Sequence, residues 1–170
     1  SPIAPASPNF NAAVKSIPGY KLLTTAPANP ITTVNGTQLT TAKSIPFAND
    51  DQVFYYVYTA NTQKVTYTVI DETDSKTLED SKLLVSGPSN SKLPNDTQAK
   101  YQDIIDGYMD KYELVGSDVL PAKFDSNDNV DQNVVIRLRH KQVSVAENKT
   151  VTQTIKYVYA DGSEAAPTKV

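Results

Sequence analysis

The sequence contains no cysteine and no tryptophan, and it has one histidine and one methionine in 170 residues. Without cysteine, the chain has no disulfide scaffold, no thiolate zinc site and no cysteine nucleophile. The single histidine, His140, has no second histidine with which to share a metal, and no serine or cysteine motif lies near it in the sequence. Enzyme chemistry is therefore a weak starting hypothesis.

Long apolar runs and clustered positive charge are also missing. No segment approaches the roughly 20 apolar residues that a membrane helix requires, so we expect no membrane insertion. The formal net charge of -3 argues against a nucleic-acid partner, because binding to phosphates needs clustered lysine and arginine. Neither end resembles a signal peptide, and we expect the sequence to be a piece of a longer protein.

What the sequence does contain favours β-structure and three segments. Its ten tyrosines, together with many valines, isoleucines and threonines, are typical of strands. Residues 1–62 carry three lysines and two acidic residues, whereas residues 63–141 carry ten basic and fourteen acidic residues. Residues 142–170 carry three of each sign. We therefore expect domain boundaries near residues 62 and 141.

Residues 63–141 have the clearest secondary-structure pattern. "KVTYTVID" alternates apolar and polar residues and, with the polar turn after it, predicts a β-hairpin. "NDTQAKYQDIIDGY" predicts the main helix, with Asn95 and Gln98 as a capping box and Gly107 at its end. "YELV" and "NVVIRLRH" predict two further strands. One helix across a small mixed sheet buries these apolar faces most simply, so we expect an α+β, β-rich fold of the ubiquitin-like β-grasp type.

The first segment has a weaker pattern. "NFNAAVKSI" predicts a short helix that ends at Pro18, and "YKLLTT" and "DQVFYYVYT" predict strands. Parts of this segment are echoed near residues 109–138, with a tyrosine-containing strand followed by a phenylalanine, an Asn/Asp turn and a β run. Such internal similarity indicates a tandem array in which neighbouring repeats of the same protein are partners.

The stretch "FDSNDNVDQNVVIRLRHK", residues 124–141, raises the question of a metal site. Four oxygen-bearing side chains fall at every second position, as calcium ligands do: Asp125, Asn127, Asn129 and Asp131. The pattern then breaks, because Val130 stands where a calcium loop has glycine and Ile136 where it has its bidentate glutamate. The alternative is a plain turn whose Asx side chains accept hydrogen bonds from backbone amides. Both interpretations remain open at this point.

Two kinds of side chain are candidate binding contacts, and both would suit a glycan. Tyr56 and Tyr58 share one face of an expected strand, and tyrosine offers a ring for stacking on sugars and a hydroxyl for hydrogen bonding. Arg137 and Arg139 form a one-sided cationic row that suits carboxylate or sulfate groups. The alternatives are that the tyrosines belong to the core and that the arginines lie on a solvated strand face.

Acidic residues in polar turns suggest a hydrolase as a further alternative. They form two groups: Asp71, Glu72 and Asp74, and then Glu79 and Asp80. Paired carboxylates carry glycosidase chemistry, but acidic pairs in turns are far more often solvated surface groups. We therefore expect no enzyme activity and no catalytic residues. We expect His140 to be a partly buried residue with its hydrogen bonds satisfied, rather than a ligand.

Residues 63–141 resemble the mucus-binding (MucBP/Mub-type) repeats of cell-wall-anchored adhesins from Gram-positive bacteria. The resemblance rests on "VTYTVIDETDSKTLE", "LLVSGPS", "YELV" and the stretch from residue 124 to residue 141. "KTVTQTIKYVYADGSEAAP" is similar to the opening of the companion domain that follows in such repeats. Residues 1–62 resemble the closing half of that companion domain, although they match less well.

The resemblance implies a secreted surface adhesin with β-grasp modules. Its expected function is non-enzymatic adhesion to host mucin glycoproteins and their glycans through many weak contacts in tandem copies. Two alternatives are a structural spacer repeat in the adhesin stalk and an immunoglobulin-binding module that uses a sheet edge. No cofactor is required, and calcium is the ion that the loop pattern suggests.

Overall fold

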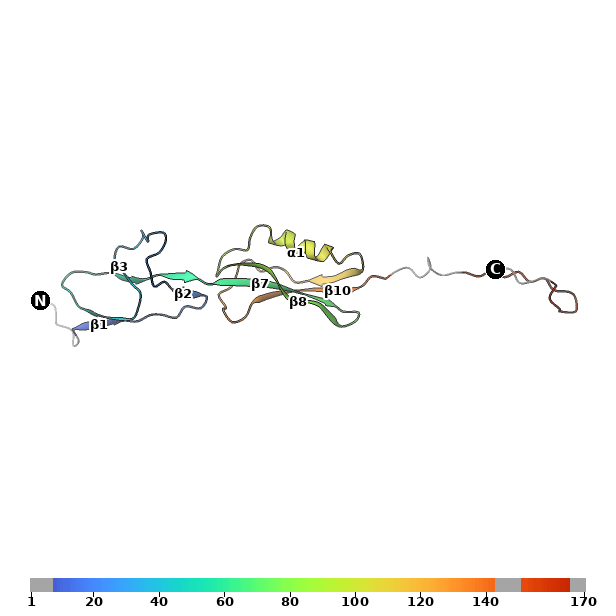
Figure 1. The fold of residues 1–170 in the computed structure, drawn as a ribbon, viewed down its shortest axis with the longest axis horizontal. Helices are drawn as coiled ribbons and strands as arrows, with labels where there is room; N and C mark the ends of the chain where they lie inside the picture. Colours follow the sequence, from blue (N-terminus) through green and yellow to red (C-terminus); the bar gives the residue numbers. More distant parts are fainter. Residues whose placement is uncertain (1–7, 143–150, 166–170) are drawn as a thin grey trace. The chain divides into compact units, whose positions relative to one another are not determined.

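The computed structural model describes residues 8–142 and 151–165 of the chain (Figure 1). The chain divides into two compact units, Ser1–His140 and Lys141–Val170. The strands of the first unit are β1 (Asn9–Ala12), β2 (Tyr20–Leu22), β3 (Thr37–Leu39), β4 (Lys43–Pro46), β5 (Phe54–Tyr56), β6 (Tyr58–Ala60), β7 (Thr62–Asp71), β8 (Lys76–Pro88), β9 (Tyr112–Ser117) and β10 (Gln132–His140). Its helix is α1 (Thr97–Asp106). The boundary that the sequence suggests near residue 62 stays a prediction.

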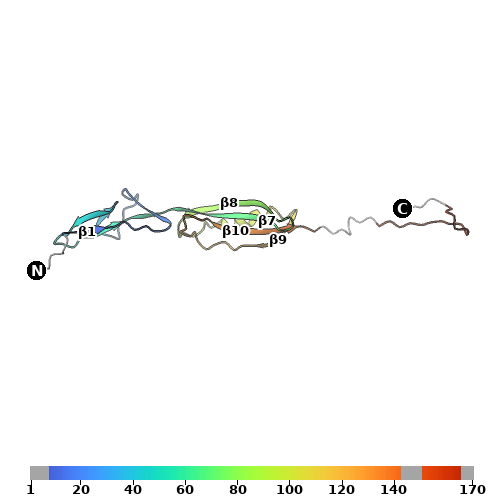
Figure 2. The same ribbon diagram turned by 90° about the horizontal axis from the view of Figure 1, so that it is seen from below.

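A four-stranded mixed sheet forms the larger part of the first unit. Its strand order is β8-β7-β10-β9, and the central strands β7 and β10 are parallel. The edge strands β8 and β9 pair antiparallel with β7 and β10 respectively. Figure 1 shows α1 lying over this sheet, and Figure 2 shows the four strands side by side. The expected β-rich fold with one helix on a mixed sheet is confirmed.

The core lies between α1 and the sheet. Its buried members are Val65, Val69, Leu84, Val85, Tyr101, Ile105, Phe124, Val134, Ile136 and Leu138. The alternation along β10 is as the sequence predicts, because every second residue from Val134 to Leu138 is buried whereas Arg139 is exposed. Tyr101 and Ile105 form the buried side of α1, as their helical spacing predicts.

The two ends of α1 differ in how well the sequence predicts them. The helix ends at the expected place, with Gly107 as the C-cap residue. The predicted capping box is wrong, because Asp96 is the N-cap residue and makes no side-chain cap hydrogen bond. Instead, the Thr97 hydroxyl donates to the carbonyl oxygen of Pro94 at 2.7 Å. That turn places the first helical residue two positions beyond Asn95, so the spacing of a capping box is lost.

Residues 8–60 form short strand pairs instead of a larger sheet. β1 pairs with β4 and β2 with β6, both antiparallel, while β3 pairs with β5 in parallel. The helix expected over residues 9–17 is wrong, because residues 9–12 are strand β1. Phe10 lies 5.4 Å from Phe47 and 6.0 Å from Phe54 between ring centroids. This aromatic packing and the ladder with β4 outweigh a weak helical pattern.

The second unit contains a tight hairpin turn within its described residues 151–165. The backbone N–H of Tyr159 donates to the carbonyl oxygen of Ser163 at 2.8 Å, and Asp161 Oδ1 accepts the N–H of Ser163 at 2.9 Å. Gly162 has a φ of +89°, a conformation that side-chain-bearing residues rarely adopt. Across the described parts of both units, no helix is long and apolar enough to cross a membrane.

Candidate functional site

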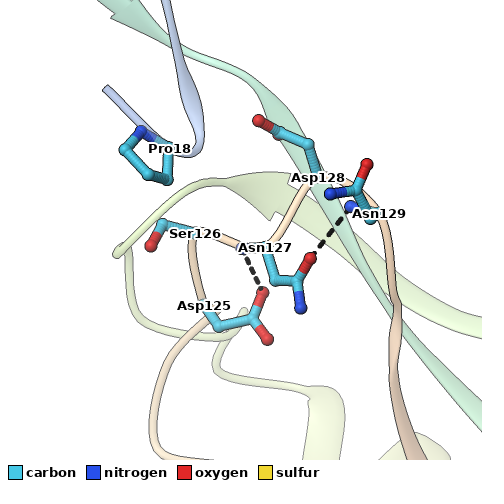
Figure 3. A pocket seen from close by; sticks show the side chains of 6 residues that line it. All are labelled: Pro18, Asp125, Ser126, Asn127, Asp128 and Asn129. Carbon is cyan, nitrogen blue, oxygen red and sulfur yellow. Dashed lines mark hydrogen bonds between the residues drawn. The ribbon is translucent and has the colours of Figure 1, made fainter. Parts of the chain in front are cut away.

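The acidic loop after Phe124 is organised by Asx turns. Asp125 Oδ1 accepts the backbone N–H of Asn127 at 3.1 Å. Asn127 Oδ1 in turn accepts the N–H groups of Asn129 at 2.9 Å and Val130 at 3.2 Å. Figure 3 shows the bonds donated by Asn127 and Asn129 following one another along the loop. Because Phe124 is buried at the start of the loop, the chain enters these turns from a fixed point.

The same loop lines an open depression of about 490 Å³ together with Pro18. The carboxylates of Asp125 and Asp128 point in different directions from it (Figure 3). Within the predicted calcium set, Asp125 and Asn127 each use one side-chain oxygen for backbone amides, whereas Asn129 and Asp131 are exposed. Calcium binding by this set stays a prediction.

Asp128 lies outside the predicted calcium set, and its carboxylate makes three hydrogen bonds to residues far away in the sequence. Its Oδ2 accepts the backbone N–H of Gly19 at 2.9 Å. Its Oδ1 accepts the side-chain amides of Asn61 at 3.1 Å and Gln63 at 2.8 Å. The hydrogen bonds from Asn61, Gly19 and Gln63 lower the pKa of Asp128 below its usual value, in that order of importance. The carboxylate is therefore a structural acceptor at neutral pH.

Ser89 completes this arrangement, which we call the junction network and define as Gly19, Asn61, Gln63, Ser89 and Asp128. The Ser89 hydroxyl donates to the carbonyl oxygen of Gly19 at 2.7 Å and accepts the Gln63 amide at 3.0 Å. Gln63 and Ser89 are buried, so the loss of one partner would leave a polar group without compensation. The network joins the chain before β7 to the four-stranded sheet, in the region where the sequence predicts a domain boundary.

Arg137 and Arg139 lie on the face of the sheet opposite α1, and each has an acidic partner. Arg137 Nη1 lies 3.1 Å from Asp118 Oδ1. Arg139 directs both Nε and Nη2 at Glu113 Oε2, at 3.1 and 3.0 Å. The arginine side chains are 41% and 60% exposed, so each pair remains open to solvent. The predicted cationic row is thus a row of two ion pairs.

Asp118 holds Arg137 in place through a second contact. Its Oδ2 accepts the backbone N–H of Val135 at 2.9 Å. This backbone hydrogen bond is the main reason for the lowered pKa of Asp118, and Arg137 lowers it further. The sequence does not reveal Asp118 or Glu113 as partners, because strand pairing brings them to the arginines from β9 and the residue after it.

Uncharged polar groups continue this face toward the start of β10. Asn133 Oδ1 accepts the hydroxyls of Thr66 at 2.9 Å and Thr68 at 3.1 Å. Thr66 and Thr68 are themselves buried, whereas Asn133 is exposed. We call the surface made by Asn133, Arg137 and Arg139, with the two acidic partners, the polar sheet face. It combines hydrogen-bond donors and acceptors on a rigid support, which is the kind of surface that sugar hydroxyls require.

Tyr56 and Tyr58 lie apart from the arginines, on β5 and β6. Both residues are half-buried. The Tyr56 hydroxyl donates to the carbonyl oxygen of Thr41 at 2.9 Å, and the Tyr58 hydroxyl donates to that of Lys15 at 2.5 Å. Each hydroxyl thus ties a loop to a strand. Their role as glycan contacts stays a prediction.

The turn between β7 and β8 brings Asp71 and Asp74 to His140. The imidazole Nε2 lies 2.7 Å from Asp71 Oδ2 and 3.3 Å from Asp74 Oδ2. His140 has its hydrogen bond satisfied, as expected, but its side chain is 45% exposed. Burial raises the pKa of Asp71. Hydrogen bonds from His140 and from the amides of Asp74 and Thr73 together lower it by more, so the net pKa lies below the usual value.

Glu79, from the other acidic group, contacts tyrosine hydroxyls. Tyr108 donates to Glu79 Oε2 at 2.6 Å, and Tyr67 donates to Oε1 at 3.2 Å. Burial raises the pKa of Tyr108 well above its usual range, and the neighbouring Glu79 raises it further. The Glu79 carboxylate therefore links Tyr108, which follows α1, to Tyr67 on the sheet. Its surroundings differ from those of Asp71 and Asp74.

The comparison with protein families gives a match in the central segment of the chain. Residues 63–140 match the family model described as "Mucin binding domain". The predicted resemblance to mucus-binding repeats is confirmed for this segment, which builds the four-stranded sheet and α1. No curated protein sequence matches the chain.

Two solved structures are similar to part of the chain. The type 2 repeat of the mucus binding protein MUB from Lactobacillus reuteri is 27% identical, with 63% of this chain and 61% of that chain covered and a TM-score of 0.39. The crystal structure of Mub-RV is 24% identical, with 63% and 58% covered and a TM-score of 0.39. The chain thus spans about three fifths of the length of each structure.

Proposed function

We propose that the chain is a non-enzymatic adhesion module that binds host mucin glycoproteins through weak contacts repeated in tandem copies. The observation that supports this most directly is the match of residues 63–140 to a family described as mucin binding. Mucin presents many similar glycans along one chain, so modules of low affinity gain avidity when several engage together. In this proposal the parent protein is a secreted adhesin anchored to a bacterial cell wall.

The domain that binds is proposed to be a β-grasp module. The chain order of its elements is hairpin, helix, strand, strand, and the first and last strands, β7 and β10, are central and parallel. Such an order, with one helix over a mixed sheet, supports the ubiquitin-like assignment. Residues before β7 and after β10 are proposed to be parts of companion domains of the repeat.

The polar sheet face is the proposed glycan contact. Glu113 neutralises Arg139 in the unbound domain, but both side chains are more than one third exposed. A sialic acid carboxylate or a sulfate group can therefore compete with Glu113 for the guanidinium. The exposed side-chain amide of Asn133 would donate hydrogen bonds to neutral sugar hydroxyls, while the buried Thr66 and Thr68 hydroxyls hold its Oδ1 in place. Tyr56 and Tyr58 are proposed as a second, independent contact.

The experiment that tests this proposal is binding of the multivalently displayed chain to mucin and to a bland protein control. We expect binding to mucin that falls after enzymatic removal of its glycans. Binding that survives glycan removal, or that is stronger to immunoglobulin, would favour the immunoglobulin-binding alternative. Equal signals on mucin and on the control would contradict adhesion and favour a spacer. Repeating the assay with a calcium chelator tests the calcium prediction for the loop.

Two variants that each neutralise one charge make the assay specific for the polar sheet face. Glu113→Gln frees the guanidinium of Arg139 and should raise binding to sialylated mucin, whereas Arg139→Gln should lower it. We expect changes of about two- to fivefold per module, the range of an exposed ion pair. Lys100→Gln is the matched control, because it removes one exposed positive charge from α1. A control that lowers binding as much as Arg139→Gln would show a nonspecific charge effect.

A further inference from the structure

Three metal-ligating side chains meet where β7 and β10 end. His140 Nε2, Asp71 Oδ2 and Asp74 Oδ2 lie within 4.8 Å of one another. The closest approaches are 2.7 Å between His140 and Asp71 and 3.3 Å between His140 and Asp74. Among residues 8–142 and 151–165, this is the one such group of three histidine, cysteine, aspartate and glutamate side chains. An imidazole between two carboxylates distinguishes it from an ordinary acidic patch.

Hydrogen bonds and a ring contact orient the side chains of Asp71 and His140. Asp71 has a side chain only 2% exposed, and its Oδ1 accepts the backbone N–H of Thr73 at 2.9 Å, so Oδ2 is directed at the imidazole. The backbone N–H of His140 donates to Thr73 Oγ1 at 2.8 Å. The Tyr112 ring meets the imidazole edge-on, with centroids 5.6 Å apart. Such supporting contacts orient ligands in protein metal sites.

The spacing of the donors is close to that of a small divalent ion site. Zinc bonds of about 2.0–2.1 Å in a tetrahedral arrangement place neighbouring ligand atoms about 3.3 Å apart. The distance from His140 to Asp74 already has this value, and the distance from His140 to Asp71 must widen by about 0.6 Å. His140 and Asp74 are 45% and 59% exposed, so both side chains are free to adjust and an ion can reach them from solvent.

We propose that Asp71, Asp74 and His140 bind a divalent transition-metal ion, and that zinc is the ion their donor set suits best. Imidazole nitrogen favours zinc over magnesium and calcium, and carboxylates complete a set that zinc accepts. Three protein ligands leave at least one coordination position for water. The site is distinct from the calcium set predicted in the loop of residues 125–131, and it does not depend on mucin binding.

The test uses zinc itself with the full chain, produced without a histidine tag. Because His140 is the one histidine of the sequence, its ring signals in an NMR spectrum are unambiguous. We expect zinc addition to shift these ring signals saturably, and isothermal titration to give one ion per chain. Ring signals that do not move at millimolar zinc would overturn the proposal and leave an ion pair between histidine and the aspartates.

Three variants separate coordination from general charge attraction. His140→Gln and Asp74→Asn each remove a ligand from the exposed side of the site and should weaken zinc binding at least about tenfold. Glu72→Gln removes an exposed charge from the same turn without removing a ligand. It should change the zinc affinity by less than about twofold. Circular dichroism melts verify that each variant is folded. Equal losses in all three variants, or no loss in the ligand variants, would overturn the proposal.

Discussion

The backbone N–H of Gly19 donates to Oδ2 of Asp128 at 2.9 Å, although 109 positions separate the two residues. Asp128 lies in an Asn/Asp-rich loop that invites a metal-binding interpretation from sequence. Its carboxylate instead joins the strands before β7 to the four-stranded sheet, with Asn61 and Gln63 as further donors. These contacts give Asp128 a structural role in the loop.

The first prediction concerns the loss of this carboxylate. Asp128→Ala removes a carboxylate that accepts three hydrogen bonds. We therefore expect faster hydrogen exchange at the amide of Gly19 and a lower thermal unfolding midpoint. Asp131→Ala, in the same loop and with the same change of charge, is the control. If both variants melt alike and the Gly19 amide exchanges at the wild-type rate in both, the junction network does not have the role described.

The second prediction is the pH dependence of that contribution. The pKa of Asp128 is lower in the folded chain than in the unfolded chain, so its stabilising effect is fully present above the unfolded value of about 4. It is lost as pH falls through the folded-state value. The difference in stability between wild type and Asp128→Ala should therefore be constant near neutral pH and shrink below about pH 4. Urea titrations at several pH values measure it, and a gap that widens in acid would contradict the assignment.

The third prediction tests Gly19 itself. Its φ of +82° disfavours any side chain, and an added Cβ would lie 2.6 Å from the Ser126 Cβ. Gly19→Ala should destabilise the first unit by about 1–3 kcal/mol, measured by chemical denaturation. Gly116→Ala is the matched control, because a Cβ added there would have no atom within 4 Å. A cost for Gly19→Ala no larger than that of the control would show that the junction tolerates a side chain.

The fourth prediction concerns the anchor of the loop. Phe124 is 1% exposed, and its ring would lie only 2.5 Å from a Cβ added at Gly87. Phe124→Ala should therefore cost about 3–5 kcal/mol in unfolding free energy, because a cavity remains in the core. Val130→Ala, at a position 63% exposed, should change it by less than about 0.5 kcal/mol. Similar values for the two would place the ring outside the core.

The secondary structure of residues 63–141 can be predicted well from the sequence because its signals are local and strong. Strict alternation along residues 134–139 assigns the two faces of β10, and the spacing of Tyr101 and Ile105 identifies the buried side of α1. The first segment was harder to predict. A short helical pattern over residues 9–17 gave way to a strand, because Phe10 finds its partners at Phe47 and Phe54, far along the chain.

The candidate sites show the same limit. Sequence reasoning selected Arg139 correctly as a residue on the sheet face away from α1, but its partner Glu113 depends on the register between β9 and β10. The sequence shows the carboxylates near Asp71 as one group, yet their meeting with His140 comes from the parallel pairing of β7 with β10. Long-range pairing of this kind has no local signature in a single sequence.

The most direct measurement of the central claim is an NMR titration of the chain with a sialylated mucin-type O-glycan. We predict saturable shifts in the backbone and side-chain signals of the polar sheet face, above all at Asn133, Arg137 and Arg139. Signals from the exposed side of α1, such as Lys100, should not move. Absence of shifts at millimolar glycan, or shifts confined to α1, would contradict adhesion through this face.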